Sequence, residues 1–321
     1  MEKRMETTQH KQLASLLGRL PLVHSKRSDV QEQYAIRSAG HFGETTTDHF
    51  LQYLHSEEYH VIQDIRLFDG IQHFQIDCLV LTPFFLLIIE VKNFRGKLIF
   101  DFEHHQLFRI FEGKKETFPD PFLQVEHQSY QLKMWLDQFN FPEIPTHSFV
   151  VVTNPKTVIK TYGPDPEGRR KRIIRPKQIL SSVTSLTSIF NREYWDFPQI
   201  KTAASRFEKE NTPYRGRILE KFNLTIEDLV KGVQCQKCKR FPMERRRDHR
   251  VCGWCGFKSK NAHLAALRDF QLLVGNEISN VEFREFAEIK TEYTARRILL
   301  ENSQSFSGRT KDRKYKLKPD I

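Results

Sequence analysis

The sequence has no long apolar run and no internal repeat, and it contains few cysteines. No stretch reaches the roughly 18 uninterrupted apolar residues that a membrane helix needs. The first twenty residues are too polar for a secretory signal, so we expect a cytoplasmic protein. The five cysteines comprise two CxxC pairs and the isolated Cys78, a pattern that fits a metal site and one buried thiol better than a disulfide framework.

Charge is unevenly spread along this chain, whose net charge is +11. Residues 1–160 hold 17 Lys and Arg against 20 Asp and Glu, whereas residues 161–321 hold 34 against 20. A basic half attached to a mildly acidic half indicates a polyanionic partner, most simply nucleic acid. A basic surface without a partner would give the same count, so that alternative stays open.

Hydrophobic periodicity predicts an α/β core in a chain long enough for two or three domains. Glycines at 40 and 43 predict a helix that begins near Glu44, followed by strands, a helix and a further strand. The segment GPDPEGRRKRIIRPK predicts an exposed loop or a boundary. The expected division is a helical arm at 1–37, an α/β domain at 38–155, a basic linker and helical region at 156–229, a four-cysteine module at 230–260 and a basic tail at 262–321.

Two predicted strands, HFQIDCLVLT and FLLIIEVKN, carry charges that buried strands rarely tolerate. We expect Pro83-Phe84 to form a two-residue turn between them. That register places Asp77 directly opposite Glu90 on one face of the sheet, with Lys92 on the same face. The spacing therefore predicts two carboxylates and an amine in one small cluster.

Two opposed carboxylates repel each other unless a cation or a proton lies between them. Mg²⁺ or Mn²⁺ would resolve the repulsion, polarise a phosphoryl oxygen and acidify a bound water. Lys92 would then orient that water or stabilise charge on phosphate. Spacing alone leaves a second interpretation open, an internal salt bridge between Lys92 and one carboxylate.

Four blocks of sequence resemble the nuclease-related domain family (NERD), within the PD-(D/E)xK superfamily that shares the restriction-endonuclease fold. They are GHFGE at 40–44, QIDCLVLT at 75–82, IIEVKNFRG at 88–96 and DPFLQ at 120–124. Their order and spacing match the family over roughly residues 38–155. The family usually has a glycine in the turn where this chain has Pro83-Phe84.

The resemblance implies a restriction-endonuclease-like core of helix, mixed sheet and helix, and Mg²⁺-dependent cleavage of DNA phosphodiesters. By position, Asp77 and Glu90 correspond to metal ligands and Lys92 to the catalytic lysine. Glu44 corresponds to a helix-borne acid that completes the metal site, and Gln124 to a glutamine that holds the site or the substrate. The alternatives are that Glu44 complements a helix dipole and that Gln124 caps a helix.

CQKC and CGWCG, separated by 13 residues, indicate a Zn²⁺ site formed by Cys235, Cys238, Cys252 and Cys255. The segment resembles a short zinc ribbon whose metal stabilises a module too small for its own core. The basic segment between the pairs predicts contact with nucleic acid, and a role in binding protein is the alternative. The candidate contact residues are Lys239, Arg240, Arg245, Arg246, Arg247 and Arg250.

The tail predicts two helices and a basic hairpin, the order of a winged helix, whose second helix and wing contact DNA. Asn280 is expected to cap the first helix, and Tyr293 to lie on the apolar stripe of the second. A solvated basic helical tail is the alternative. The residues expected to approach phosphate are Arg296, Arg297, Arg309, Lys311, Arg313 and Lys314.

The sequence therefore predicts a metal-dependent DNA nuclease with a structural zinc ribbon and a basic tail that holds DNA. Two other classes fit the same features. One is a non-catalytic DNA-binding accessory protein that keeps the nuclease fold, and the other is an interaction scaffold whose zinc ribbon binds protein.

Overall fold

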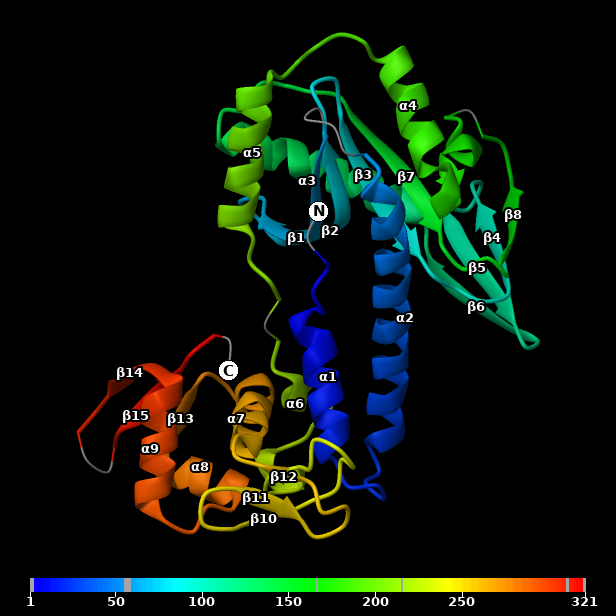
Figure 1. The fold of residues 1–321 in the computed structure, drawn as a ribbon. Coiled ribbons are helices and arrows are strands. Elements are labelled where there is room, and N and C mark those ends of the chain that lie inside the picture. Colours follow the sequence, from blue (N-terminus) through cyan, green and yellow to red (C-terminus); the bar gives the residue numbers. More distant parts are fainter. Residues whose placement is uncertain (1–2, 55–58, 166, 215, 310–311, 320–321) are drawn as a thin grey trace. The chain divides into compact units, whose positions relative to one another are not determined.

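The computed structural model describes residues 3–54, 59–165, 167–214, 216–309 and 312–319 (Figure 1). Within these residues, every helix is too short or too polar to span a bilayer. The architecture is mixed α/β, with several small sheets and helices between them.

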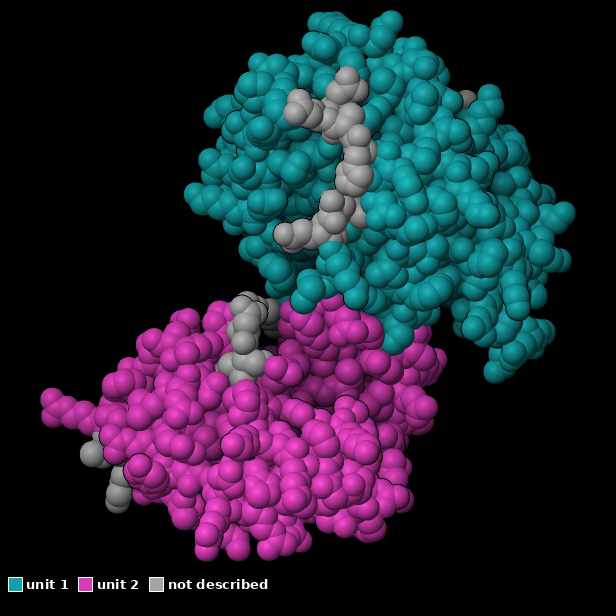
Figure 2. Space-filling model, viewed as in Figure 1, with its two compact units in different colours: residues 1–5, 37–214 teal, residues 6–36, 215–321 magenta. Residues whose placement is uncertain are grey.

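The chain forms two compact units, which are coloured separately in Figure 2. Unit 1 comprises residues 1–5 and 37–214, and unit 2 comprises residues 6–36 and 215–321. Unit 1 contains 23 Lys and Arg and 23 Asp and Glu, whereas unit 2 contains 28 and 17. The net charge of the chain therefore belongs entirely to unit 2.

The central sheet of unit 1 is mixed, with the strand order β1-β2-β3-β7-β9. β1, β2 and β3 pair antiparallel, and β3, β7 and β9 pair parallel. The predicted strands of the core are present. Their bounds are β1 His60–Phe68, β2 His73–Leu81, β3 Leu86–Lys92, β7 Thr146–Val152 and β9 Ile173–Ile174.

A second sheet in unit 1 has the order β6-β5-β4-β8. The sequence indicated one or two of its strands but not a separate sheet, because β8 comes from the segment expected to be a linker. β8 pairs parallel to β4. The bounds are β4 Lys97–Asp101, β5 Gln106–Phe111, β6 Lys114–Pro119 and β8 Val158–Tyr162.

Helices cover both faces of the central sheet (Figure 1). α3 (Pro121–Gln138) and α5 (Phe197–Glu210) share one hydrophobic core with the sheet, in which Trp135 stacks on Phe207 with ring centroids 4.3 Å apart. On the other face, α4 (Ile179–Ile189) and the C-terminal end of α2 pack around Val80. The sheet is therefore buried on both sides, so a charged side chain at its edge needs a partner.

α2 is one continuous helix, Arg27–Leu51, that passes through both glycines. The prediction that a helix starts near Glu44 is therefore wrong. A Cβ at Gly43 would lie 2.7 Å from the Cβ of Asn93 and 2.9 Å from Oγ1 of Thr153. Gly43 thus allows close packing of the helix against the sheet, instead of marking the start of the helix.

The basic segment after Gly168 is not an exposed loop but part of unit 1. Residues Arg169–Arg172 form a 3₁₀ helix, η1, and β9 follows directly as the last strand of the central sheet. The side chain of Arg169 is buried and pairs with Glu126 at 3.0 Å and Glu167 at 2.9 Å. Pairing with nearby acids explains why a run of basic residues can pack against the domain. A second 3₁₀ helix, η2, spans Pro176–Gln178.

Unit 2 has one hydrophobic core that α1 (Thr8–Arg19) shares with the C-terminal segments. Cys235 and Cys252 lie in that core, beside residues of α7 and α8. A three-stranded sheet, β10-β11-β12, holds the cysteine pairs, and a second has the order β13-β15-β14. The bounds are α6 Ile218–Lys221, η3 Ile226–Asp228, β10 Met243–Arg245, β11 Arg250–Cys252, β12 Lys258–Ser259, α7 Ala262–Leu273, β13 Glu277–Ser279, α8 Asn280–Ala287, α9 Glu292–Asn302, β14 Ser303–Ser307 and β15 Lys314–Leu317.

The predicted helix, helix and hairpin of the tail are present as α8, α9 and β14–β15. Two details differ from expectation. Ser279, not Asn280, caps α8, since its side chain accepts a hydrogen bond from the N–H of Glu282. Tyr293 is 79% exposed and does not join the apolar stripe of α9, which Ile298 supplies.

Candidate active site and metal centre

The turn between β2 and β3 sets the register of the candidate active site. Thr82 N–H donates to the carbonyl of Phe85 at 3.2 Å, so Pro83-Phe84 is the two-residue turn that the sequence predicted. The Thr82 hydroxyl oxygen accepts hydrogen bonds from the N–H groups of Phe84 and Phe85. These bonds stabilise a turn of a kind that usually contains glycine. Pairing then runs from Leu81 opposite Leu86 to Cys78 opposite Ile89. Asp77 and Glu90 are the next positions along this register.

β1 and β2 are irregular where the acids lie. Asp64 falls between the paired positions Gln63–Cys78 and Ile65–Ile76, and its φ is +49°. Aspartate adopts this left-handed conformation more readily than most residues. The irregularity interrupts the strict alternation of faces and leaves Asp64 and Asp77 at the same level of two neighbouring strands.

Glu90, Lys92 and Gln124 are in direct contact. Lys92 Nζ donates to Glu90 Oε1 at 2.5 Å and to Gln124 Oε1 at 3.2 Å. Glu90 is buried, and its Oε2 has no hydrogen-bond partner among the residues that the structure describes. Gln124 lies in the first turn of α3, but Asp120 caps that helix by accepting from the N–H of Phe122. Gln124 is therefore directed to the lysine instead of capping the helix.

Asp77 lies beside this group and is held by the backbone of β3. Its Oδ2 accepts a hydrogen bond from the N–H of Val91 at 2.9 Å. Burial raises the pKa of Asp77 well above its usual range, and the nearby carboxylates of Glu90 and Glu44 raise it further. A buried group of acids with this property favours a cation among them.

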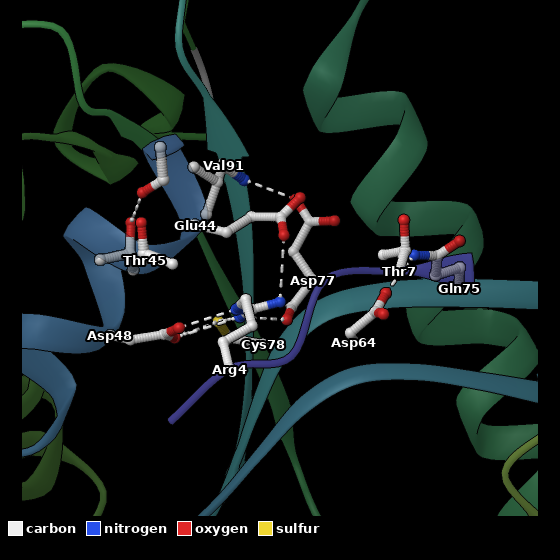
Figure 3. A network of polar contacts seen from close by, with 12 residues as sticks. Arg4, Thr7, Glu44, Thr45, Asp48, Asp64, Gln75, Asp77, Cys78 and Val91 are labelled. Carbon is white, nitrogen blue, oxygen red and sulfur yellow. Dashed lines mark hydrogen bonds and ion pairs between the residues drawn. The ribbon is translucent and has the colours of Figure 1, made fainter. Parts of the chain in front are cut away.

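The N-terminal segment places Arg4 among the neighbouring acids (Figure 3). Its Nε lies 2.7 Å from Oδ2 of Asp48, and its NH1 lies 3.2 Å from Oε2 of Glu44. NH2 donates to the carbonyl oxygen of Asp77 and to the sulfur of Cys78, both at 3.0 Å. The Arg4 side chain is only 2% exposed, so this is a buried ion-pair network.

Cys78 is fully buried in the core that α2 and α4 share with the central sheet, and its thiol contacts Arg4 of the ion-pair network. Burial raises the pKa of its thiol well above the ordinary value, which keeps it protonated. The thiol donates a hydrogen bond to Oδ1 of Asp48, with the sulfur 3.7 Å from that oxygen. Its position agrees with the predicted packing role.

Each predicted acidic ligand is thus engaged by a different group of this chain. Arg4 holds Glu44, Lys92 holds Glu90, and the N–H of Val91 holds Asp77. Across the described part of the chain, only the four cysteines bring three or more metal-ligating side chains within 4.8 Å of one another. The three carboxylates are therefore neighbours, but not a closed ligand set.

Sequence reasoning missed Arg4, Asp48 and Asp64. Burial raises the pKa of Asp64 and that of Glu44. Repulsion from Asp64 and from Asp48 raises the pKa of Glu44 further. Asp48 follows Glu44 by one helical turn in α2, so an i, i+4 pair of acids was the available signal for it. Arg4 carried no signal, since it lies in a polar segment 73 residues before Asp77.

The second candidate site is the cysteine cluster of unit 2. The sulfur atoms of Cys235 and Cys255 are 3.6 Å apart, and those of Cys238 and Cys252 are 3.5 Å apart. A tetrahedral zinc ion with Zn–S bonds of about 2.3 Å requires sulfur separations of about 3.8 Å. The cluster therefore has the donor chemistry and the dimensions of a zinc site.

The backbone of the second cysteine pair is arranged for a thiolate. N–H groups of Cys255 and Trp254 directed to the sulfur of Cys252 lower the pKa of that thiol to about 6. Gly256, with φ +68°, supports the turn that follows Cys255. Deprotonation of this sulfur favours metal binding near neutral pH.

Most predicted contact residues for nucleic acid are exposed in unit 2, with four exceptions. Arg250 is buried and donates to the carbonyls of Met243 and Ala287, so it is structural. Lys314 is partly buried and pairs with Glu282 at 2.7 Å. Lys311 lies outside the described residues. The exposed ones are Lys239, Arg240, Arg245, Arg246, Arg247, Arg296, Arg297 and Arg309, while Arg313 is partly exposed.

The basic residues of the cysteine module and of α9 lie near one another. Burial, together with the guanidinium groups of Arg250, Arg245 and Arg297, lowers the pKa of His263 to about 4. Arg245 belongs to β10 and Arg297 to α9, so two separate elements of unit 2 bring positive charge to one region.

Comparison with known proteins supports one part of the chain. Residues 39–153 match the family model described as "Nuclease-related domain", which confirms the resemblance predicted from the sequence. Neither the curated proteins nor the solved structures that were searched gave a match. The match includes every residue of the predicted acidic site, whereas Arg4, which the sequence did not predict, lies outside its bounds. Residues 39–153 of this chain are therefore similar to the nuclease-related domain family, and this match covers less than half of the chain.

Proposed function

We propose that this protein is a metal-dependent nuclease that hydrolyses DNA phosphodiester bonds. The observation that carries the proposal is the arrangement around Lys92. Its amine is held between Glu90 and Gln124, beside Asp77, in a domain that matches the nuclease-related family. A salt bridge alone would not require a second buried acid next to it, because that acid adds repulsion.

The residues present fit a hard divalent cation. Oε2 of Glu90 is buried and has no hydrogen-bond partner in the described part of the chain, and Asp77 uses one carboxylate oxygen for Val91. These oxygens, with Glu44 nearby, are the ligand type that Mg²⁺ or Mn²⁺ prefers. When bound, such an ion would supply Lewis-acid polarisation of the phosphate and a more acidic water.

The chain's own residues supply the rest of the proposed mechanism. Lys92 is the group that orients the attacking water or stabilises negative charge on the phosphoryl oxygens. Gln124 fixes the amine from α3, so the lysine has a defined position before substrate arrives. Asp77 and Glu90 would hold the cation, and Glu44 would complete the acidic set from α2.

Unit 2 is proposed to hold the DNA. The order α7, β13, α8, α9, β14, β15, with the sheet order β13-β15-β14, supports a winged-helix-like tail. In such a module the second helix and the wing approach the duplex, and Arg296, Arg297 and Arg313 are their cations. Structural Zn²⁺ on the four cysteines would maintain the adjacent basic module.

A cleavage assay tests the proposal. Purified protein is incubated with linear, circular and single-stranded DNA in the presence of Mg²⁺, Mn²⁺ or a chelator. Cleavage is expected only with added metal. Asp77→Ala and Lys92→Ala should each lower the rate by about 10²- to 10⁴-fold, the range typical of groups that act on the reacting atoms. Lys114→Ala, an exposed lysine on β6 of the same unit, is the matched control and should cleave like the wild type.

The same assay separates the other two classes. Salt-sensitive DNA binding without cleavage, equal in the wild type and in Asp77→Ala, would replace the nuclease with a DNA-binding accessory protein. Absence of DNA binding at low salt would instead favour a scaffold that binds protein through its cysteine module. Equal cleavage by the wild type and by Lys92→Ala would refute the proposed site, although not nuclease activity as such.

A further inference from the structure

The cysteine module exposes a large aromatic side chain that no fold requirement explains. Trp254 lies between Cys252 and Cys255, in a turn whose backbone N–H groups serve the cysteine sulfur. Its side chain is 65% exposed, although tryptophan is among the residues that proteins bury most completely on average. The other tryptophans, Trp135 and Trp195, are each 1% exposed and belong to the core of unit 1.

The surroundings of Trp254 are positively charged. The guanidinium of Arg240 lies over the indole ring, 4.6 Å from its centroid. Residues 235–260 contain nine Lys and Arg but only two acids, Glu244 and Asp248. Both acids are taken up locally, since Glu244 pairs with Arg246 at 3.1 Å and Asp248 with His249 at 2.8 Å. The module that carries the indole therefore keeps a net positive charge.

We propose that Trp254 and Arg240 form a stacking site for an unpaired base of single-stranded DNA. The exposed indole offers a flat surface for a base, and Arg240, already stacked on the ring, extends that surface. Arg245 and Arg247, which are exposed on the same small module, neutralise the phosphates on either side. The bases of a duplex are stacked on each other and cannot reach the ring, so the site selects single strands, overhangs or frayed ends.

A protein partner fits these observations less well. Protein interfaces are enriched in Trp and Arg but depleted in Lys, whereas residues 235–260 carry both Lys and Arg, which together outnumber the acids nine to two. Charge complementarity favours a polyanion, and the aromatic plane favours a base over a phosphate alone. The inference rests on the proposed function only in taking nucleic acid as the partner. It does not depend on the acidic site.

Intrinsic fluorescence tests the inference directly, because Trp254 is the one exposed tryptophan of the three in this chain and all three lie within the described residues. The zinc-loaded full-length protein is titrated with a 20-nucleotide oligo(dT) and with a duplex of the same length, without added Mg²⁺. Oligo(dT) is expected to quench the exposed tryptophan emission, and the duplex should leave most of it. In Trp254→Phe the quenching disappears while affinity for oligo(dT), followed by fluorescence anisotropy of a labelled strand, stays within about threefold.

Affinity changes in variants give the second measurement. Trp254→Ala should weaken oligo(dT) binding by about tenfold or more, while duplex binding changes by less than about twofold. Tyr130→Ala, which removes an exposed aromatic ring from α3 of unit 1, is the matched control and should bind like the wild type. Arg240→Ala should weaken single-strand binding in the same direction as Trp254→Ala. Zinc content is measured for each variant, so that a loss of the module is recognised.

Three results would overturn the inference. The first is unchanged oligo(dT) affinity in a zinc-loaded Trp254→Ala protein. The second is equal quenching by oligo(dT) and by the duplex, and the third is no quenching by either. Failure of the proposed nuclease would look different, since the wild type would then cleave none of the DNA substrates with Mg²⁺ or Mn²⁺ while single-strand quenching remained.

Discussion

The two compact units use charge in opposite ways. In unit 1 the numbers of acidic and basic residues are equal. The charged side chains at the candidate active site form ion pairs that are largely buried, such as Arg4 with Asp48 and Lys92 with Glu90. In unit 2 basic residues outnumber acidic ones, and most candidate contact residues are exposed, on the four-cysteine module and on the tail. Buried charges need partners and fixed geometry, whereas exposed charges need only a scaffold.

This difference indicates how each unit would meet DNA. A site that stabilises a reacting phosphate depends on side chains that are already fixed before substrate arrives. A surface that holds the DNA backbone depends on the number of positive charges and tolerates small displacements of each one. The contrast therefore predicts that single substitutions in unit 1 act by displacing side chains with fixed positions. Unit 2 should be most sensitive to substitution of the cysteines that stabilise its scaffold.

Removing the metal site of unit 2 should have the largest effect. Cys235 is fully buried in the core of that unit and is one of the four clustered cysteines. We expect Cys235→Ser to lose bound zinc and to expose the amides of residues 235–259, because so small a module depends on its metal for stability. Zinc content by elemental analysis and amide hydrogen exchange measure the two effects.

Cys78→Ser is the matched control for the zinc prediction. Cys78 lies in unit 1, outside the cysteine cluster, so this variant should keep the zinc content of the wild type. Full zinc content in Cys235→Ser would show that Cys235 is not a required ligand, whereas lost zinc with unchanged hydrogen exchange would show that the module does not depend on a metal.

Breaking the buried ion pairs of unit 1 should have the next largest effect. Arg4→Ala leaves the carboxylates of Asp48 and Glu44 without their cation in a buried environment. Loss of one partner from a buried pair typically costs about 3–5 kcal/mol of unfolding free energy. Urea denaturation followed by the emission of Trp135 and Trp195, which are both buried in unit 1, measures the change in that unit.

Two further variants sharpen the Arg4 prediction. Lys3→Ala removes an exposed cation from the neighbouring position and should change the unfolding free energy by less than about 0.5 kcal/mol. In Arg4→Ala combined with Asp48→Ala, the loss should be smaller than the sum of the two single losses, because the unpaired acid is gone. Additive losses would mean that the Arg4–Asp48 pair contributes no coupling.

The part of the site that lies on β2 and β3 could be predicted because its information is local. Two apolar runs of similar length flank Pro83-Phe84, and the hydroxyl of Thr82 supports the two-residue turn. Once that turn is assumed, the facing positions follow from a period of two. The order of the elements in the tail, two helices and then a hairpin, could likewise be predicted from helical spacing and turn residues.

The remainder depends on contacts between distant segments. Arg4 reaches the site from a polar segment that has no hydrophobic period, so nothing near it in sequence predicts the contact. β8 and β9 come after the family-like blocks and complete two sheets by parallel pairing. Parallel pairing leaves no hairpin signal in the sequence, so a basic segment was interpreted as a loop.

The glycines of α2 show how the same residue type supports opposite interpretations. Gly43 lies next to Glu44, and its missing side chain lets the helix approach the ends of β3 and β7. Gly40 lies one turn earlier, where the nearest atom to an added Cβ is a flexible carboxylate oxygen of Glu44 at 4.0 Å. Packing at Gly43 therefore fixes the height of Glu44 over the sheet, while Gly40 only weakens the helix.

Alanine at each position separates these two roles and gives the smallest expected effects. Gly43→Ala forces a Cβ to within 3 Å of Asn93 and Thr153, and should destabilise unit 1 by about 1–3 kcal/mol. Gly40→Ala meets no such contact and should stabilise the helix by about 0.5–1 kcal/mol, the propensity difference between glycine and alanine. The same urea titration, followed by Trp135 and Trp195, reports both changes. If both variants gained stability, α2 would not be packed closely at Gly43, and the position of Glu44 would have to be set by Arg4 alone.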